Sequence, residues 1–129
     1  MKRDFVSAVK PENPEKETLV RGRDLQTGSP SAVKVTAGEI YPIVEEIVEK
    51  IARVVQDTLT ELRPEIAADI YDRGILMTGG GALLDGLDKY LRDFVNLSVI
   101  VPDEPHYATV RGLVKMFDEP ELLEKVSRN

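Results

Sequence analysis

A short apolar run, three glycines and a second apolar run follow one another in the stretch Gly74-Ile-Leu-Met-Thr-Gly-Gly-Gly-Ala-Leu-Leu84. This order predicts a buried strand, a glycine turn and the start of a helix. Such a turn lets backbone approach a ligand without a Cβ in the way, and free N–H groups at a helix start favour anionic or polar ligand groups. A turn that is merely packed tightly looks the same, so both interpretations stay open.

The residues after the turn predict a further helix and strand. The helix has an apolar face of Leu83, Leu84, Leu87, Tyr90, Leu91 and Phe94. The strand is the run Leu97-Ser-Val-Ile-Val-Pro102. Because this run and Ile75–Thr78 are nearly continuously apolar, we expect parallel strands that are covered on both faces.

A last helix should follow the second strand. Asp103 suits its N-cap and Pro105 its first turn. We expect its inward face to hold Val110, Leu113, Val114 and Phe117. The charged tail from Asp118 should fray.

The segment before the glycine stretch predicts an arm, a hairpin and two helices. Residues 7–18 are polar and rich in proline, as in a loop or mobile arm, and residues 18–25 and 31–36 form two extended runs around a Gly-Ser-Pro turn. Thr36 and Glu39 then match a capping box at a helix start. Pro64 should open a short helix that ends at Asp72-Arg-Gly74.

The capping box should open a long helix with one buried face. Its apolar positions repeat at three and four residues: Ile40, Ile43, Val44, Ile47, Val48, Ile51, Val54, Val55, Leu59 and Leu62. The width of this stripe favours packing on a sheet over a coiled-coil dimer. Pro42 clashes with a preceding helical turn, so we expect a kink or a true start near Tyr41.

Composition limits the classes of function. The chain has 129 residues and a net charge of -6, which argues against a general nucleic-acid binder because such binding needs clustered Lys and Arg. It has no cysteine, no secretory signal and no stretch that approaches a membrane span. We therefore expect one domain-sized cytoplasmic chain without direct membrane insertion.

The residues offer little independent chemistry. His106 is the only histidine, so a zinc site is not expected, and Ser98 and Thr78 have no base to activate them. Glu45, Glu46 and Glu49 fit a solvated helix face. Asp85 and Asp88 fit a helix start, where carboxylates complement the dipole. We assign no catalytic and no metal residue.

Two strands alone make too small a sheet, so the hairpin or another molecule should complete it. Four stretches resemble the C-terminal part of MreB, the family of bacterial actin-like rod-shape-determining proteins: Val20-Arg-Gly-Arg-Asp-Leu-Gln-Thr-Gly-Ser-Pro30, Pro64-Glu-Ile-Ala-Ala-Asp-Ile-Tyr-Asp-Arg-Gly-Ile-Leu-Met-Thr-Gly-Gly-Gly-Ala-Leu-Leu84, Gly86-Leu-Asp88 and Asp103-Glu-Pro105. The match covers residues 7 to 118 in order. The chain departs from the family at Pro105-His-Tyr-Ala-Thr109 and at Leu113-Val-Lys-Met-Phe117.

The resemblance implies an α/β fold: a partial actin-like, ribonuclease H-like subdomain with an N-terminal β-hairpin from the small subdomain. Residues 1–36 would be the hairpin portion, and residues 37–129 would resemble the second large subdomain. In that family ATP lies between the two halves of the molecule. The segment against the nucleotide would be Gly79, Gly80, Gly81, Ala82 and Leu83.

The family's phosphate-gripping Asp-x-Gly loops, its catalytic acid and its ribose-binding helix lie upstream of the matched region. We therefore expect no ATP hydrolysis, and weak or absent ATP binding, by this chain alone. The implied function is that of a partial cytoskeletal protein in cell-shape determination, with an interaction surface and one wall of an ATP pocket. Alternatives are a module that caps full-length MreB filaments and a free-standing nucleotide-binding enzyme. The expected partner is a second copy, paired symmetrically, or a full-length MreB-like protein.

Overall fold

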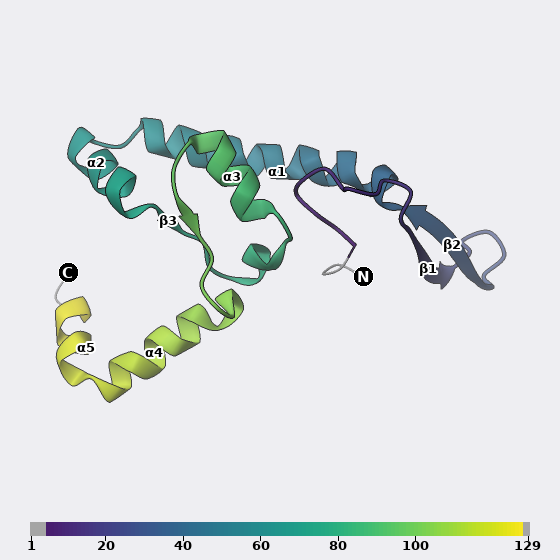
Figure 1. The fold of residues 1–129 in the computed structure, drawn as a ribbon. Helices are drawn as coiled ribbons and strands as arrows, with labels where there is room; N and C mark the ends of the chain where they lie inside the picture. Colours follow the sequence, from purple (N-terminus) through teal and green to yellow (C-terminus); the bar gives the residue numbers. More distant parts are fainter. Residues whose placement is uncertain (1–4, 128–129) are drawn as a thin grey trace.

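The computed structural model describes residues 5–127, and Figure 1 shows them as an elongated molecule. A long helix, α1 (Ala37–Thr60), connects a hairpin at one end of the molecule with a shorter helix, α2 (Pro64–Arg73), at the other. The remaining elements lie along one side of α1, and the two last helices project away from it (Figure 1).

The hairpin consists of β1 (Glu17–Arg23) and β2 (Pro30–Thr36), which pair antiparallel. Its turn is closed by Asp24, whose Oδ1 accepts hydrogen bonds of 2.8 Å from the N–H groups of Thr27 and Gln26. These bonds favour the ionised carboxylate and hold the pKa of Asp24 below its ordinary value. The hairpin expected from the sequence is confirmed.

Helix α1 begins with the capping box that the sequence predicts. The Thr36 hydroxyl accepts a bond of 3.2 Å from the N–H of Glu39, and the Glu39 carboxylate accepts one of 2.7 Å from the N–H of Thr36. The expected start near Tyr41 is wrong, because the helix runs uninterrupted from Ala37 with Pro42 inside it (Figure 1). The box satisfies free N–H groups of the first turn, which offsets the single bond that the proline removes.

Helix α2 opens at Pro64 and is closed by Gly74, as expected. Gly74 has φ of 78° and ψ of -171°, a conformation open essentially to glycine alone. Its N–H donates to the carbonyl of Ile70 at 2.7 Å. This ending turns the chain directly from α2 into the next strand.

The second sheet pairs β3 (Ile75–Leu76) with β4 (Val99–Ile100), and the two strands are parallel as expected. The ladder is shorter than the apolar runs suggested. The expectation of cover on both faces is wrong: Val99 is buried, but Leu76 and Ile100 are 64% and 49% exposed. Neighbouring residues of a strand point to opposite faces, so one face of this sheet is bare.

The chain after the glycines does not enter an α-helix directly. A 3-10 helix, η1 (Gly80–Leu83), comes first, and the α-helix α3 (Leu87–Val95) starts only after Gly86. Gly86 takes the left-handed conformation with φ of 72°, which interrupts helical geometry. Leu83 and Leu84 therefore lie outside the helix in which the apolar periodicity had placed them.

The C-terminal region differs most from expectation. A 3-10 helix, η2 (Pro105–Tyr107), precedes α4 (Ala108–Asp118), and Asp103 does not serve as an N-cap. The tail forms a further helix, α5 (Pro120–Ser127). The expected inward face of α4 is exposed, with fractions of 49% to 81% at Val110, Leu113, Val114 and Phe117. Amphipathic periodicity shows that a face is apolar, but not that this chain covers it.

The core lies between α1, α3 and the inner face of β3 and β4. Its buried members are Ala8, Val48, Ala52, Leu87, Leu91 and Val99. The stripe predicts that α1 packs on a sheet, but α1 meets this core chiefly through α3. The expectation that the whole stripe is buried is wrong, because Ile43, Ile47, Ile51 and Val54 are 42% to 65% exposed. The core still joins segments that are far apart in the sequence.

The expected N-terminal loop is present, but it is attached to the body. The N–H of Ala8 donates to the carbonyl of Asp85 at 2.7 Å, and Ala8 is fully buried. Further along, the N–H of Gly38 donates to the carbonyl of Pro14 at 2.9 Å. These bonds connect the loop to the region before α3 and to the start of α1.

Candidate functional site

The glycine turn joins the end of β3 to η1. Gly79 has φ of 89° and ψ of 177°, again a conformation that only glycine adopts easily. Its N–H donates to the carbonyl of Pro105 at 2.8 Å, so η2 supports the turn from the side. Pro105 is itself buried, so the residue that accepts this hydrogen bond is held in place by its packing.

Two backbone donors of the turn remain free. The N–H groups of Ala82 and Leu84 donate to the carbonyls of Gly79 and Gly81 at 3.3 and 3.0 Å. Within residues 5–127, no hydrogen bond is donated by the N–H groups of Gly80 and Gly81, because the first N–H groups of a helix have no partner inside it. These two adjacent N–H groups can donate hydrogen bonds to polar atoms of a ligand.

The turn is open to solvent. Gly80 and Gly81 are exposed, Leu83 is half-buried, and Ala82 is buried at 8% exposure. Apart from adjoining residues of the turn and of η1, no atom of the described chain lies within 4 Å of the place where a Cβ would stand on Gly79, Gly80 or Gly81. The space next to the turn is therefore free for a ligand or another chain.

The structure gathers the five predicted residues, Gly79 to Leu83, in one turn, but the helix that follows the turn directly is the 3-10 helix η1. Because η1 is only 4 residues long, the contribution of a helix dipole is small. The chemistry of the turn consists of two N–H donors and close approach to the backbone.

Residues of η2 were missing from the predicted site. The contact between Gly79 and Pro105 joins backbone atoms across the fold, and no side-chain pattern in the sequence signals it. His106 and Tyr107 are exposed beside it, with ring centroids 4.0 Å apart.

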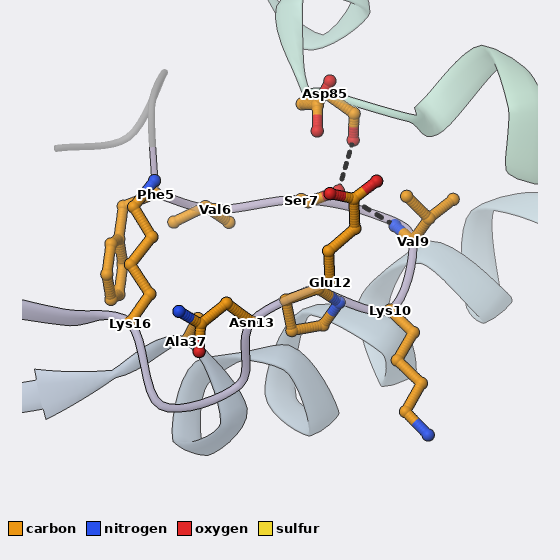
Figure 2. A pocket seen from close by; sticks show the side chains of 11 residues that line it. Phe5, Val6, Ser7, Val9, Lys10, Glu12, Asn13, Lys16, Ala37 and Asp85 are labelled. Carbon is orange, nitrogen blue, oxygen red and sulfur yellow. Dashed lines mark hydrogen bonds between the residues drawn. The ribbon is translucent and has the colours of Figure 1, made fainter.

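A cavity of about 540 Å³ lies away from the turn, beneath the N-terminal loop (Figure 2). Its wall includes Ser7, Val9, Lys10 and Asp85. Ser7 Oγ donates to the carbonyl of Asp85 at 3.3 Å and accepts from the N–H of Val9 at 3.2 Å (Figure 2). These bonds attach the loop to the region before α3, so the Ser7 hydroxyl already has a structural role.

The charged groups considered in the sequence lie on solvated faces. Glu46 and Glu49 pair with Lys50 and Arg53 one turn further along α1, each at 2.6 Å. Asp88 pairs with Arg92 at 3.1 Å in α3. The described residues contain no group of three or more side chains placed to hold a metal ion. None of the helices within residues 5–127 combines the length and apolar character that a membrane crossing requires.

Comparison with solved structures defines the class as actin-like. MreB5 of Spiroplasma citri bound to AMPPNP aligns with a TM-score of 0.80 at 29% identity, over 98% of this chain and 37% of that protein. Its ADP-bound form aligns with a TM-score of 0.81, over 99% of this chain and 38% of that protein. This likeness confirms the predicted fold: a partial actin-like α/β structure with an N-terminal hairpin.

The sequence comparisons define the family. The model of the MreB/Mbl protein family matches residues 1–125, and the chain belongs to this family. The cell shape-determining protein Mbl of Bacillus subtilis is 36% identical over 120 residues, 93% of this chain and 36% of Mbl. The cell shape-determining protein MreB of Escherichia coli is 35% identical over 107 residues, 83% of this chain and 31% of MreB. The chain thus spans about a third of the length of these relatives.

Proposed function

We propose that the chain acts in the bacterial cell-shape cytoskeleton as part of an actin-like subunit, with an interaction surface and one wall of an ATP pocket. The observation that carries this proposal is the glycine turn within an MreB/Mbl chain: two free N–H groups, at Gly80 and Gly81, with empty space before them. Two similar structures are of MreB5 of Spiroplasma citri bound to AMPPNP and to ADP, which supports ATP as the ligand.

The residues at the turn fit a nucleotide. A Cβ at Gly79, Gly80 or Gly81 would project into the open space, so glycine keeps the backbone accessible. The two free N–H groups would donate to oxygen atoms of the nucleotide. Leu83 would give this wall of the pocket an apolar side chain. The contact between Gly79 and Pro105 holds the donors in place before a ligand arrives.

One wall does not make a tight site. Ligand pockets usually bury most of the ligand surface, and this turn faces open solvent. Micromolar affinity requires about 8 kcal/mol, a large part of which the opposite wall would supply. Phosphoryl transfer further needs magnesium, phosphate donors and a positioned water. We therefore propose a structural role in the cytoplasm for this chain, without ATP hydrolysis of its own.

The proposed partner is an MreB-like protein or a second copy of the chain. The exposed apolar side chains of α1 and α4 give the chain an interaction surface that needs no charge complementarity. The relatives are named as cell shape-determining proteins, which supports the same process for this chain.

The proposed role can be tested by expressing the chain in Bacillus subtilis, the organism of its relative Mbl. A fluorescent fusion of the chain should join assemblies that contain Mbl and alter cell width or outline at raised expression. The matched variant Leu25→Ser, at a 99% exposed position in the hairpin turn, should behave like the unmodified chain. Uniform fluorescence with unchanged cell shape would contradict the proposed function.

A further inference from the structure

Glu104, which lies just before η2, has an unusual backbone conformation. Its φ of 51° and ψ of 59° place it in the left-handed region, which is unfavourable for a residue with a side chain. Within residues 5–127, the only other residue besides glycine with positive φ is Asn96, and asparagine tolerates this conformation better. Glu104 also precedes Pro105, and a residue before proline favours extended backbone. Two local preferences are therefore overridden at this position.

Arg111 of α4 binds this strained segment at two points. Its Nη2 pairs with the carboxylate of Glu104, and its Nη1 donates to the carbonyl of Asp103 at 3.2 Å. The planar guanidinium presents several donors in a fixed geometry, which suits two neighbouring acceptors. The start of α4 is thus joined back to the loop in front of η2.

The same segment supports the glycine turn. The carbonyl of Pro105 accepts the N–H of Gly79 at 2.8 Å, and Pro105 is buried. Because proline fixes its own φ, the backbone of Glu104 sets the direction in which the chain continues through Pro105. A change at Glu104 would therefore move the acceptor of Gly79. The free N–H groups of Gly80 and Gly81, which follow directly, would move with it.

We propose that Arg111 is a positioning residue for the glycine turn. It holds Glu104 in the left-handed conformation, so that the carbonyl of Pro105 stays in place beneath the turn. The two free N–H groups then keep the geometry in which they bind a nucleotide. This proposal rests on the proposed function and names a residue on which that site depends. Strained backbone persists only where the surrounding structure holds it, and it is concentrated at functional sites.

General stabilisation of the fold is the competing explanation for this contact. The side chains of Arg111 and Glu104 are 57% and 53% exposed, and an exposed ion pair contributes little to the free energy of unfolding. Neither residue belongs to the buried core. Removal of the guanidinium should therefore change the stability of the whole chain very little, and its effect should be confined to η2 and the turn.

Amide exchange of the full chain separates these two roles. Arg111→Gln should accelerate exchange at Gly79 by about fivefold, because the support of its hydrogen bond is loosened locally. The urea midpoint should stay close to that of the unmodified chain. The matched control is Arg53→Gln, since Arg53 pairs with Glu49 at 2.6 Å on an exposed face of α1. This control should leave exchange at Gly79 unchanged.

A second substitution provides a rescue that a general packing role would not give. Glycine takes the left-handed conformation without strain, so Glu104→Gly should remove the need for the guanidinium. The double variant Glu104→Gly, Arg111→Gln should return exchange at Gly79 to within about twofold of the unmodified chain, although the ion pair is absent.

NMR titration with millimolar ATP links the positioning to the ligand. ATP should shift the amide signals of Gly80 and Gly81 in the unmodified chain and in the double variant, and much less in Arg111→Gln. Unaltered exchange at Gly79 in Arg111→Gln, no recovery in the double variant, or equal ATP shifts with and without Arg111→Gln would overturn the proposal. Equal shifts would leave the proposed pocket wall intact, whereas no shift in the unmodified chain would contradict that wall and the proposal together.

Discussion

Gly74 occupies a position that no other residue can take without strain. Its φ and ψ lie in a region that costs other residues about 1–3 kcal/mol, and a Cβ there would stand 2.6 Å from the carbonyl oxygen of Ser98. The position of the Cβ is fixed by the backbone of residue 74, and the oxygen belongs to the backbone of Ser98, so neither atom can move aside without a shift of the backbone. The junction of α2 with the sheet thus requires glycine at position 74.

Gly74→Ala should destabilise the chain by about 2 kcal/mol or more, from backbone strain and this steric clash. The matched change Gly112→Ala, in the open middle of α4, should be neutral or stabilise by up to about 1 kcal/mol. Urea unfolding of both variants measures the difference. Equal midpoints for the two variants would show that the geometry at Gly74 is not required.

Glu39 should make the start of α1 sensitive to acid. Bonds from Thr36 favour the ionised carboxylate, so the pKa of Glu39 lies below its ordinary value of 4.5. A lowered pKa means that the stabilisation is present above pH 4.5 and is lost as the pH falls through the folded value. Titration of the side-chain carboxyl by NMR should show the lowered pKa. Thr36→Ala keeps the backbone N–H, which is the larger cause, and removes only the hydroxyl, so it should return the pKa part of the way toward 4.5. A pKa at or above 4.5 in the unmodified chain would contradict the capping box as its determinant.

At the level of elements, the sequence predicts those parts of the fold whose causes are local. The capping box at Thr36, the turn before Pro30 and the ending at Gly74 each depend on residues only a few positions apart. The apolar spacing predicts a helix that already contains Leu83 and Leu84. This prediction is wrong because Gly86 interrupts the helical geometry, so α3 begins only at Leu87. The exposure of the apolar α4 face depends on which other segments pack against it, and no local sequence pattern contains that information.

The N-terminal loop should depend on Gly86. This residue has φ of 72°, and its missing Cβ would lie 2.8 Å from Cγ2 of Val9. Gly86→Ala should push the loop away and accelerate amide exchange at Ala8 by about tenfold, the equivalent of 1.4 kcal/mol. The second change Val9→Ala should reverse part of this effect because it removes the clash. Gly81→Ala, which meets no atom, serves as the control. An unaltered exchange rate at Ala8 in Gly86→Ala would contradict the steric account.

At the scale of the whole molecule, the candidate site was only partly predictable. The glycines mark the turn, since positive φ and close approach require this residue type. The supporting carbonyl of Pro105 is invisible in the sequence, because it acts through backbone atoms brought together by the fold. The bare face of the β3–β4 sheet and the exposed part of the stripe on α1 likewise appear only in three dimensions. All of these features belong to an actin-like fold, in which we propose that the glycine turn forms one wall of an ATP pocket.

Calorimetric titration with magnesium and ATP tests this central claim most directly. The chain alone should give no saturable heat at micromolar ATP. A complex of the chain with the part of Bacillus subtilis Mbl outside the 120 matched residues, which would supply the opposite wall, should bind. Gly80→Asp should abolish binding in the complex, because a carboxylate would fill the open space and repel phosphate. Tight, magnesium-dependent binding by the chain alone, or equal binding by the complex with and without Gly80→Asp, would contradict the account.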